Sequence, residues 1–213
     1  MNDRIVRNRI ATWIGLGLLL VGLTASTCTE DRMIEIVVGA EVGAEFQARG
    51  SINTFNDEAV LNVATDADLR QILDDNGFEG LVVAQIEAAF VRVTKQDDNA
   101  ADRTVTGTVT VRRTGTVVES ALITNVTEPI NDASLADWQP VPLETAGVSL
   151  INQAMAEYLL DLYNNVAVPR EPNLTFTISG TSSPQGVTTN FDWEVKVKMN
   201  LVGSKSITVI EPI

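Results

Sequence analysis

The clearest pattern in the chain is an alternation of apolar and polar residues near its C-terminal end. Apolar side chains at every second position from Phe191 to Leu201 alternate with polar side chains from Asn190 to Asn200. Successive side chains of a β-strand point to opposite faces of the sheet, so this period of two predicts a strand over residues 187–202. One face of this strand is expected to pack in a core and the other to meet solvent.

Shorter stretches of the same kind occupy much of the remaining chain. Residues 103–113 alternate valine with threonine, a Thr-Gly-Thr turn follows, and residues 117–126 return, which predicts a β-hairpin. Further strands are predicted at residues 33–39, 45–52, 59–64, 81–93 and 174–180, with the polar residues 53–58 as a turn and residues 204–213 as a candidate terminal strand.

Two segments have helical periodicity instead. Residues 65–77 predict a short helix with Asp66 as its N-cap and Gly77 as its left-handed stop. Residues 145–165 predict a long helix with apolar residues at three- and four-residue spacing. Its stripe consists of Val148, Ile151, Met155, Tyr158, Leu159 and Leu162. Such a stripe is expected to pack on a core.

Together these elements predict a mainly β (α+β) fold for a single domain over residues 28–213. Strands that alternate between a dry and a wet face are typical of antiparallel sheets. We therefore expect an antiparallel β-sandwich, or a curved sheet, with one long and one short helix. The strands are too few and too irregular for a membrane β-barrel.

The first 27 residues have a different organisation. Three arginines among the first nine residues precede an apolar run at residues 10–23, and small residues follow at 24–26. Basic, then apolar, then small is the layout of a secretory signal peptide. The apolar run is shorter than the roughly 20 residues that a membrane-spanning helix needs. Residues 1–27 are therefore predicted to be a signal peptide.

The sequence LTASTC at residues 23–28 resembles the processing site of bacterial lipoproteins, and the resemblance covers only the first 28 residues. Thr27 stands where that class usually has Gly or Ala, and Ala25 where Leu is common. The resemblance implies that Cys28 is acylated, becomes the mature N-terminus and attaches the domain to a lipid bilayer. The resemblance also implies a place at the outer membrane of a bacterial cell envelope, because Thr29 stands where an aspartate marks retention at the inner membrane in that class.

Two other interpretations of the leader stay open. Ordinary cleavage near Ser26 would give a secreted or periplasmic protein, and an uncleaved apolar segment would act as a membrane anchor. In either of these cases Cys28 would not be lipidated. The first predicted strand begins at Met33, so almost no linker separates Cys28 from the predicted domain.

The composition excludes several kinds of chemistry. The chain has no histidine and one cysteine, which removes histidine-dependent triads, histidine-ligated zinc or haem, internal disulfides and thiolate metal sites. The net charge is −13, and three basic residues and one acidic residue precede Cys28, so the segment from Cys28 onward carries −15. A chain this acidic repels phosphate backbones, and we expect no nucleic-acid partner.

Candidate ligand sites are few. Asp97, Asp98, Asn99 and Asp102 gather oxygen atoms of the kind that bind Ca²⁺, although their spacing is not that of an EF-hand. The favoured interpretation of this cluster is a polar turn. Trp138 is either an exposed aromatic for sugar or protein contact or a plug at one end of the sandwich, and the plug is favoured.

The functional expectation is correspondingly broad. The sequence favours a membrane-anchored envelope lipoprotein that is not an enzyme, uses no cofactor, and serves as a structural or interaction module for an envelope protein or glycan. The alternative is a secreted or anchored adhesive domain that binds carbohydrate or Ca²⁺. A hydrolase that uses paired carboxylates is the third class left open.

Overall fold

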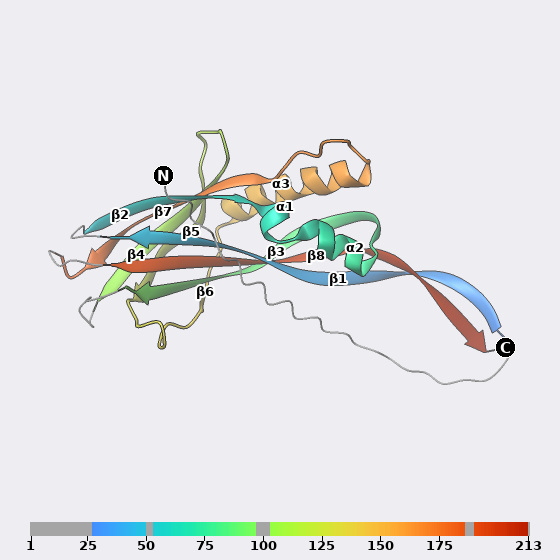
Figure 1. Ribbon diagram of the computed structural model, residues 1–213, viewed down its shortest axis with the longest axis horizontal. Coiled ribbons are helices and arrows are strands. Elements are labelled where there is room, and N and C mark those ends of the chain that lie inside the picture. The colour runs from blue at the N-terminus through green and yellow to red at the C-terminus, as the bar shows by residue number, and fades with distance from the viewer. Residues whose placement is uncertain (1–26, 50–52, 97–102, 186–189, 213) are drawn as a thin grey trace. The chain divides into compact units, whose positions relative to one another are not determined.

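The computed structural model describes residues 27–49, 53–96, 103–185 and 190–212. Within them lie eight strands and three helices (Figure 1). The chain divides into two compact units, a larger one at Met33–Ile207 and a smaller one that joins Met1–Arg32 to Thr208–Ile213. In the smaller unit, Thr208 Oγ1 donates a hydrogen bond of 2.8 Å to Asp31 Oδ1. The larger unit contains the helices, the second sheet and most of the first sheet, two strands of which continue into the smaller unit.

The first sheet contains the longest strands, in the order β1-β8-β3-β6. These strands are β1 (Thr27–Ala48), β3 (Glu79–Lys95), β6 (Gln139–Val141) and β8 (Phe191–Pro212). β3 runs antiparallel to β8 and to β6. The alternating apolar residues from Phe191 to Leu201 are each at most 2% exposed, which confirms the strand predicted there. The candidate terminal strand is the continuation of β8.

The second sheet has the order β2-β7-β4-β5 and is antiparallel throughout. Its strands are β2 (Thr54–Asn62), β4 (Thr104–Arg113), β5 (Ser120–Pro129) and β7 (Asn173–Ser183). β4 and β5 form the predicted hairpin, and Val105, Val109 and Val111 on β4 are fully buried. The apolar faces of both sheets contribute to one core, so the mainly β, sandwich-like fold predicted from the sequence is confirmed.

Two predicted boundaries near the start of the domain are wrong. Residues 45–48 end β1 instead of beginning a strand of their own, and the supposed turn at 53–58 is mostly β2. Only Phe55 in this stretch is buried, while the side chain of Asp57 accepts a hydrogen bond from Gln47 N at 2.9 Å. An edge strand whose outward positions are all polar has the composition of a turn, which explains the error.

The predicted short helix is two helices, α1 (Val63–Asp66) and α2 (Leu69–Asn76). The N-cap is Asn62 and not Asp66, since the Asn62 side chain accepts hydrogen bonds from Ala64 N and Thr65 N. Asp68 adopts a left-handed conformation with φ of 49°, which interrupts the helix. Gly77 ends α2 in the left-handed region, as predicted.

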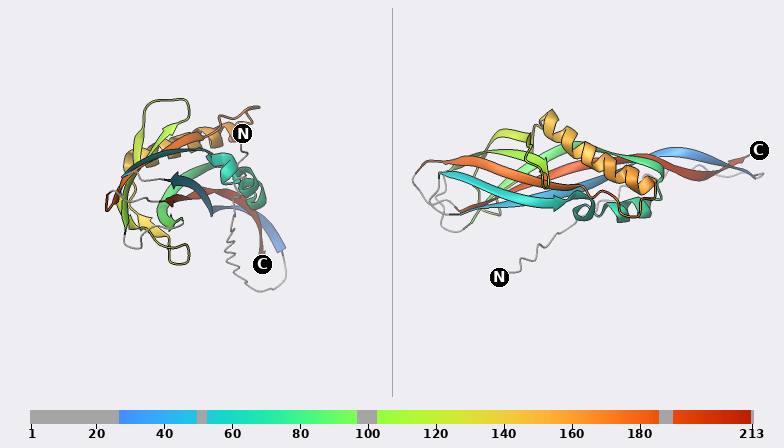
Figure 2. Two further views of the ribbon diagram at one scale, coloured as in Figure 1. Left: turned by 60° about the vertical axis from the view of Figure 1, so that its left-hand side comes forward. Right: turned by 90° about the horizontal axis from the view of Figure 1, so that it is seen from above.

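The long helix α3 (Thr145–Tyr163) packs against β3 of the first sheet and against β4 and β5 of the second (Figure 2). Its buried side chains include most of the predicted stripe, with Ile151 and Met155 at most 1% exposed. Burial of one such side chain contributes about 1.5–3 kcal/mol. Asn152 Oδ1 also accepts a hydrogen bond of 3.2 Å from Ile86 N on β3, so the helix satisfies a backbone donor of that strand.

Two glycines make room for aromatic rings in the core. Gly180 on β7 lies opposite both Phe55 on β2 and Gly107 on β4. Trp193 from the first sheet packs directly over Gly107, where an added Cβ would lie 3.1 Å from its ring. Phe55 completes the cluster, with ring centroids 6.2 Å from Trp193 and 5.2 Å from Phe191. Because Gly180 and Gly107 have no side chains, the core has room for the ring of Trp193, its largest buried side chain.

Candidate functional site

The residues that the sequence proposed as sites lie mostly outside the described part of the chain. Cys28 lies in the second position of β1, and its side chain is outside the described part of the chain. Asp97, Asp98, Asn99 and Asp102 also fall outside the described residues. Elsewhere, in the ranges that are described, no group of three or more acidic or cysteine side chains could hold a metal ion. No described helix is long and apolar enough to cross a membrane.

The most organised surface is the solvent face of the first sheet, opposite the core, which we call the outer face. Arg92 on β3 pairs with Glu194 on β8 through two hydrogen bonds, of 2.6 Å from Nε and 2.7 Å from Nη2. This bonding raises the pKa of Arg92 and keeps its charge fixed. Lys196 and Lys198 both lie near the carboxylate of Glu41, at 3.6 Å and 3.3 Å.

Trp138 lies on this outer face, just before β6. The Arg92 guanidinium carbon is 4.7 Å from the centroid of its ring, and the Lys196 ammonium nitrogen is 4.4 Å away. Both distances are within the range of a cation–π interaction. The ring is half-buried, and both cations belong to the solvent face, so Trp138 covers the outside of the sheet and does not plug the end of the sandwich. The plug prediction is wrong.

The outer face becomes apolar toward the N-terminal part of β1. Along β8 its residues run from Lys198 through Asn200 to Val202, and Val202 pairs with Val83 of β3. Met33, Glu35 and Val37 share the face of β1 that carries Glu41, because they are separated from it by even numbers of strand residues. One carboxylate therefore lies among the apolar side chains at this end. We call Met33, Val37, Leu81, Val83 and Val202 the apolar end of the outer face.

A bulge in β3 shapes this apolar end. Glu79 pairs with Ser204 and Val83 with Val202, so residues 80–82 face the single residue Gly203. Gly80 supports the bulge with a φ of 87°, a conformation that other residues rarely adopt. Ser204 Oγ fixes the bulge by donating a hydrogen bond of 2.8 Å to Glu79 O. Leu81 is left 48% exposed.

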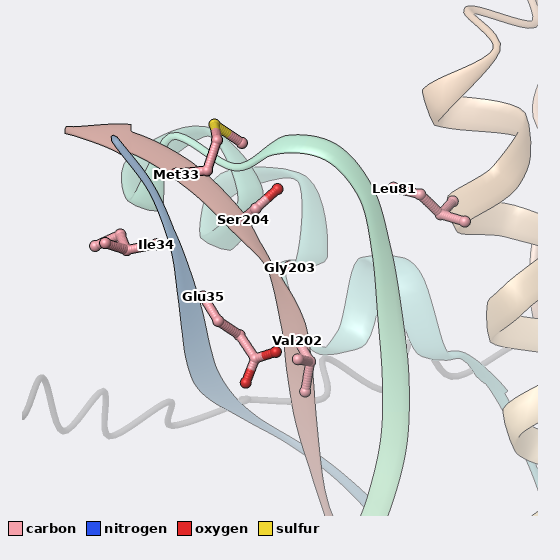
Figure 3. A pocket seen from close by; sticks show the side chains of 7 residues that line it. All are labelled: Met33, Ile34, Glu35, Leu81, Val202, Gly203 and Ser204. Carbon is pink, nitrogen blue, oxygen red and sulfur yellow. The ribbon is translucent and has the colours of Figure 1, made fainter. Parts of the chain in front are cut away.

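Beside the bulge is an open pocket of about 360 Å³. Figure 3 shows its lining, which comes from β1, β8 and β3. The residues are Met33, Ile34, Glu35, Leu81, Val202, Gly203 and Ser204. Met33 is 60% exposed and Glu35 is the only charged side chain in this set. Its polar side chains are those of Glu35 and Ser204, and the Ser204 hydroxyl is engaged by Glu79 O.

A separate cluster of charges is structural. Asp161 near the end of α3 accepts hydrogen bonds from Arg170, at 2.8 Å from Nε, 2.7 Å from Nη2 and 2.9 Å from the backbone N. These bonds lower the pKa of Asp161 to about 2. The neighbouring Glu157 pairs with Arg113 of β4 at 2.7 Å and 2.8 Å, which lowers its pKa as well. The bonds between Arg170 and Asp161 hold the segment after α3 against that helix.

Sequence reasoning missed the outer face as a surface. It placed Lys196 and Lys198 correctly on the wet side of a strand, but their grouping with Arg92, Phe90 and Trp138 depends on which strands are neighbours. Lys198 Nζ lies 5.1 Å from the centroid of Phe90. Gly80 was a local indication of the bulge, because a glycine inside a strand often marks a β-bulge.

No protein-family model and no curated protein matches the chain. Among solved structures, it is similar to Desmodium yellow mottle tymovirus, with a TM-score of 0.32 and 9% identity over 96% of this chain and 97% of that one. It is also similar to the decameric BFDV capsid protein, with a TM-score of 0.37 and 7% identity over 79% of this chain and 99% of that one. At these TM-scores the similarity supports no conclusion about function.

Proposed function

We propose that this protein is a lipoprotein of the bacterial cell envelope, attached to a bilayer through acylated Cys28 and serving as a non-catalytic structural or interaction module. The observation that carries the proposal is the position of Cys28. It is the only cysteine of the chain, and it follows directly after a basic, apolar and small-residue leader.

The fold is compatible with such an attachment. β1 begins at Thr27, one residue before Cys28, so the proposed attachment point belongs to a described strand. Two or more acyl chains on one residue hold a protein stably on a bilayer, because each buried methylene contributes about 0.8 kcal/mol. A single strand joined directly to the lipid would restrict the domain to the neighbourhood of the headgroups.

The non-catalytic part of the proposal is supported by chemistry that the chain lacks and by the surfaces it presents. The sequence contains no histidine, and the polar side chains of the described pocket are one carboxylate, Glu35, and one hydroxyl, Ser204. The outer face, with its paired charges and Trp138, has the composition of a contact surface, since aromatic residues and arginine are enriched in interfaces.

Metabolic labelling with palmitate tests the anchor. The wild type is expected to incorporate the label, and Cys28→Ser is expected to lose it completely. Thr27→Ala is the matched control, because it places the usual alanine before Cys28 and should keep the label. The intact mass of the mature protein should correspond to an acylated chain that begins at Cys28. Label retained in Cys28→Ser, or a mature N-terminus elsewhere, would refute the proposal.

A further inference from the structure

Every exposed residue of α3 is uncharged. A helix at a protein surface normally presents charged and polar side chains to solvent. The charged residues of α3 are only Glu157 and Asp161, and each is paired with an arginine. Six of the exposed residues recur at intervals of three, four, three, four and three, and we call them the α3 seam. They are Ala146, Ser149, Gln153, Ala156, Leu160 and Tyr163.

The spacing of the α3 seam is that of a coiled coil. Alternating intervals of three and four are those of heptad positions a and d, which form one narrow line along a helix and pack against a second helix. In Figure 2, α3 lies on the outside of the sheets with no other described helix or strand over it. Leu160 is 42% exposed and Tyr163 is 54% exposed. The α3 seam is therefore open to a partner helix.

The α3 seam is complementary in size to a reversed copy of itself. Its first two side chains are small and its last two are large. Because the intervals are the same in both directions, an antiparallel second copy places each small end against a large end, as interdigitating layers require. A parallel copy would place large against large and leave a gap at the other end. The antiparallel pairs are Ala146 with Tyr163, Ser149 with Leu160, and Gln153 with Ala156.

Charge also favours a second copy at this face. The segment from Cys28 onward carries −15, so two copies repel each other over most of their surfaces. The α3 seam lets them meet without bringing unpaired like charges together. Glu157, which lies beside the α3 seam, is paired with Arg113 at 2.7 Å.

We propose that two copies of this chain associate through their α3 seams, with the helices antiparallel and a two-fold axis passing between Gln153 and Ala156. A two-fold contact uses the same surface on both copies and closes at a dimer. The inference goes beyond the proposed function, because the contact needs neither an acyl chain nor a bilayer.

Disulfide trapping tests both the contact and its direction. The variants are made in the full-length chain with Cys28→Ser, so that only introduced cysteines carry thiols. In Ser149→Cys/Leu160→Cys, each thiol faces the other position on the second copy. Within one helix these positions are about 16 Å apart, which is too far for an internal disulfide. Ser149→Cys/Val60→Cys is the matched control, because Val60 is 63% exposed and lies on β2.

The protein is purified in detergent, treated with a mild oxidant and examined on a non-reducing gel. The double variant Ser149→Cys/Leu160→Cys is expected to form a covalent dimer, whereas each single variant and the control should stay monomeric. Adding Ala156→Glu, which places carboxylates beside the two-fold axis, should abolish the dimer. All these positions are exposed, so urea unfolding should show the stability of the Cys28→Ser parent.

Two results would overturn the inference. Dimers from the single variants would show that the helices lie parallel. No dimer from the double variant, or as much dimer from the control, would remove the contact itself. Palmitate labelling of the wild type depends on neither result, so this inference and the proposed function can fail separately.

Discussion

Gly180 offers a sharp test of how tightly the two sheets are packed. It lies at the centre of the second sheet, between Phe55 of β2 and Gly107 of β4. A Cβ added at Gly180 would lie 2.2 Å from Thr106 O, 2.4 Å from Phe55 Cζ and 2.9 Å from Gly107 Cα. Two of these three atoms belong to the backbone of a hydrogen-bonded strand, so a side-chain rotation cannot relieve the contact.

The magnitude follows from these distances. Overpacking of a well-packed core costs about 1–3 kcal/mol and occasionally more. Replacement of a strand glycine by alanine returns about 0.5–1 kcal/mol, because the unfolded chain loses freedom. All three contacts would be shorter than the 3.0 Å below which Cβ atoms are essentially never found, and two involve backbone. We therefore expect Gly180→Ala to lower the free energy of unfolding by about 2–3 kcal/mol, a large part of the 5–15 kcal/mol typical of a domain.

Urea unfolding followed by circular dichroism measures the effect, with two graded controls. Gly107→Ala should cost less, because its Cβ would meet only the ring of Trp193, at 3.1 Å. Gly39→Ala has nothing within 4 Å and should leave stability unchanged or slightly higher. A free energy of unfolding for Gly180→Ala within about 0.5 kcal/mol of the wild type would refute the packing argument, as would equal losses in all three variants.

Three further predictions concern α3 and the acidic loop. Met155→Ala should lower the free energy of unfolding by about 2–5 kcal/mol because the side chain is fully buried, whereas Leu160→Ala, at a position 42% exposed, should cost much less in the same titration. Asp161 has a pKa lowered to about 2, so its ion pair stabilises the fold above about pH 4, and that stability is lost as the pH falls toward 2; Asp161→Asn should flatten this part of the pH–stability curve, and an unchanged curve would contradict the role of the pair. If the cluster from Asp97 to Asp102 is a polar turn, as favoured, the melting temperature should be the same in Ca²⁺ and in EDTA, and a rise in Ca²⁺ would support the adhesive alternative.

The sequence predicted the fold class and most strands because a strict period of two is hard to produce by chance. β8 and the β4–β5 hairpin were recognised for that reason, and α3 was recognised by its spacing of three and four. The predicted boundaries of elements were wrong where the residue composition suggests one kind of structure and the burial of the side chains shows another. The polar outward residues around Phe55 give this strand the composition of a turn. The left-handed conformation of Asp68 divides into two helices a segment whose periodicity predicts one.

The candidate surface was less predictable because it is made by neighbours in space. The alternation placed Lys196 and Lys198 on a solvent face, but nothing local indicates that Arg92 and Trp138 share that face. The strand order, with β8 between β1 and β3, is the missing information. The interpretation of Cys28 rests instead on neighbours in the sequence, because it comes entirely from the residues that precede Cys28 in the chain.

The strand order also governs when the protein can fold. β8, which follows the other described strands in the chain, occupies the position between β1 and β3, so these two strands cannot be joined until residues 191 onward are available. Contacts between distant parts of the sequence slow folding, since a long loop must close before they form. A chain released before Phe191 would leave β1 without its neighbour and the β8 side of β3 unpaired, and such exposed strand edges favour aggregation.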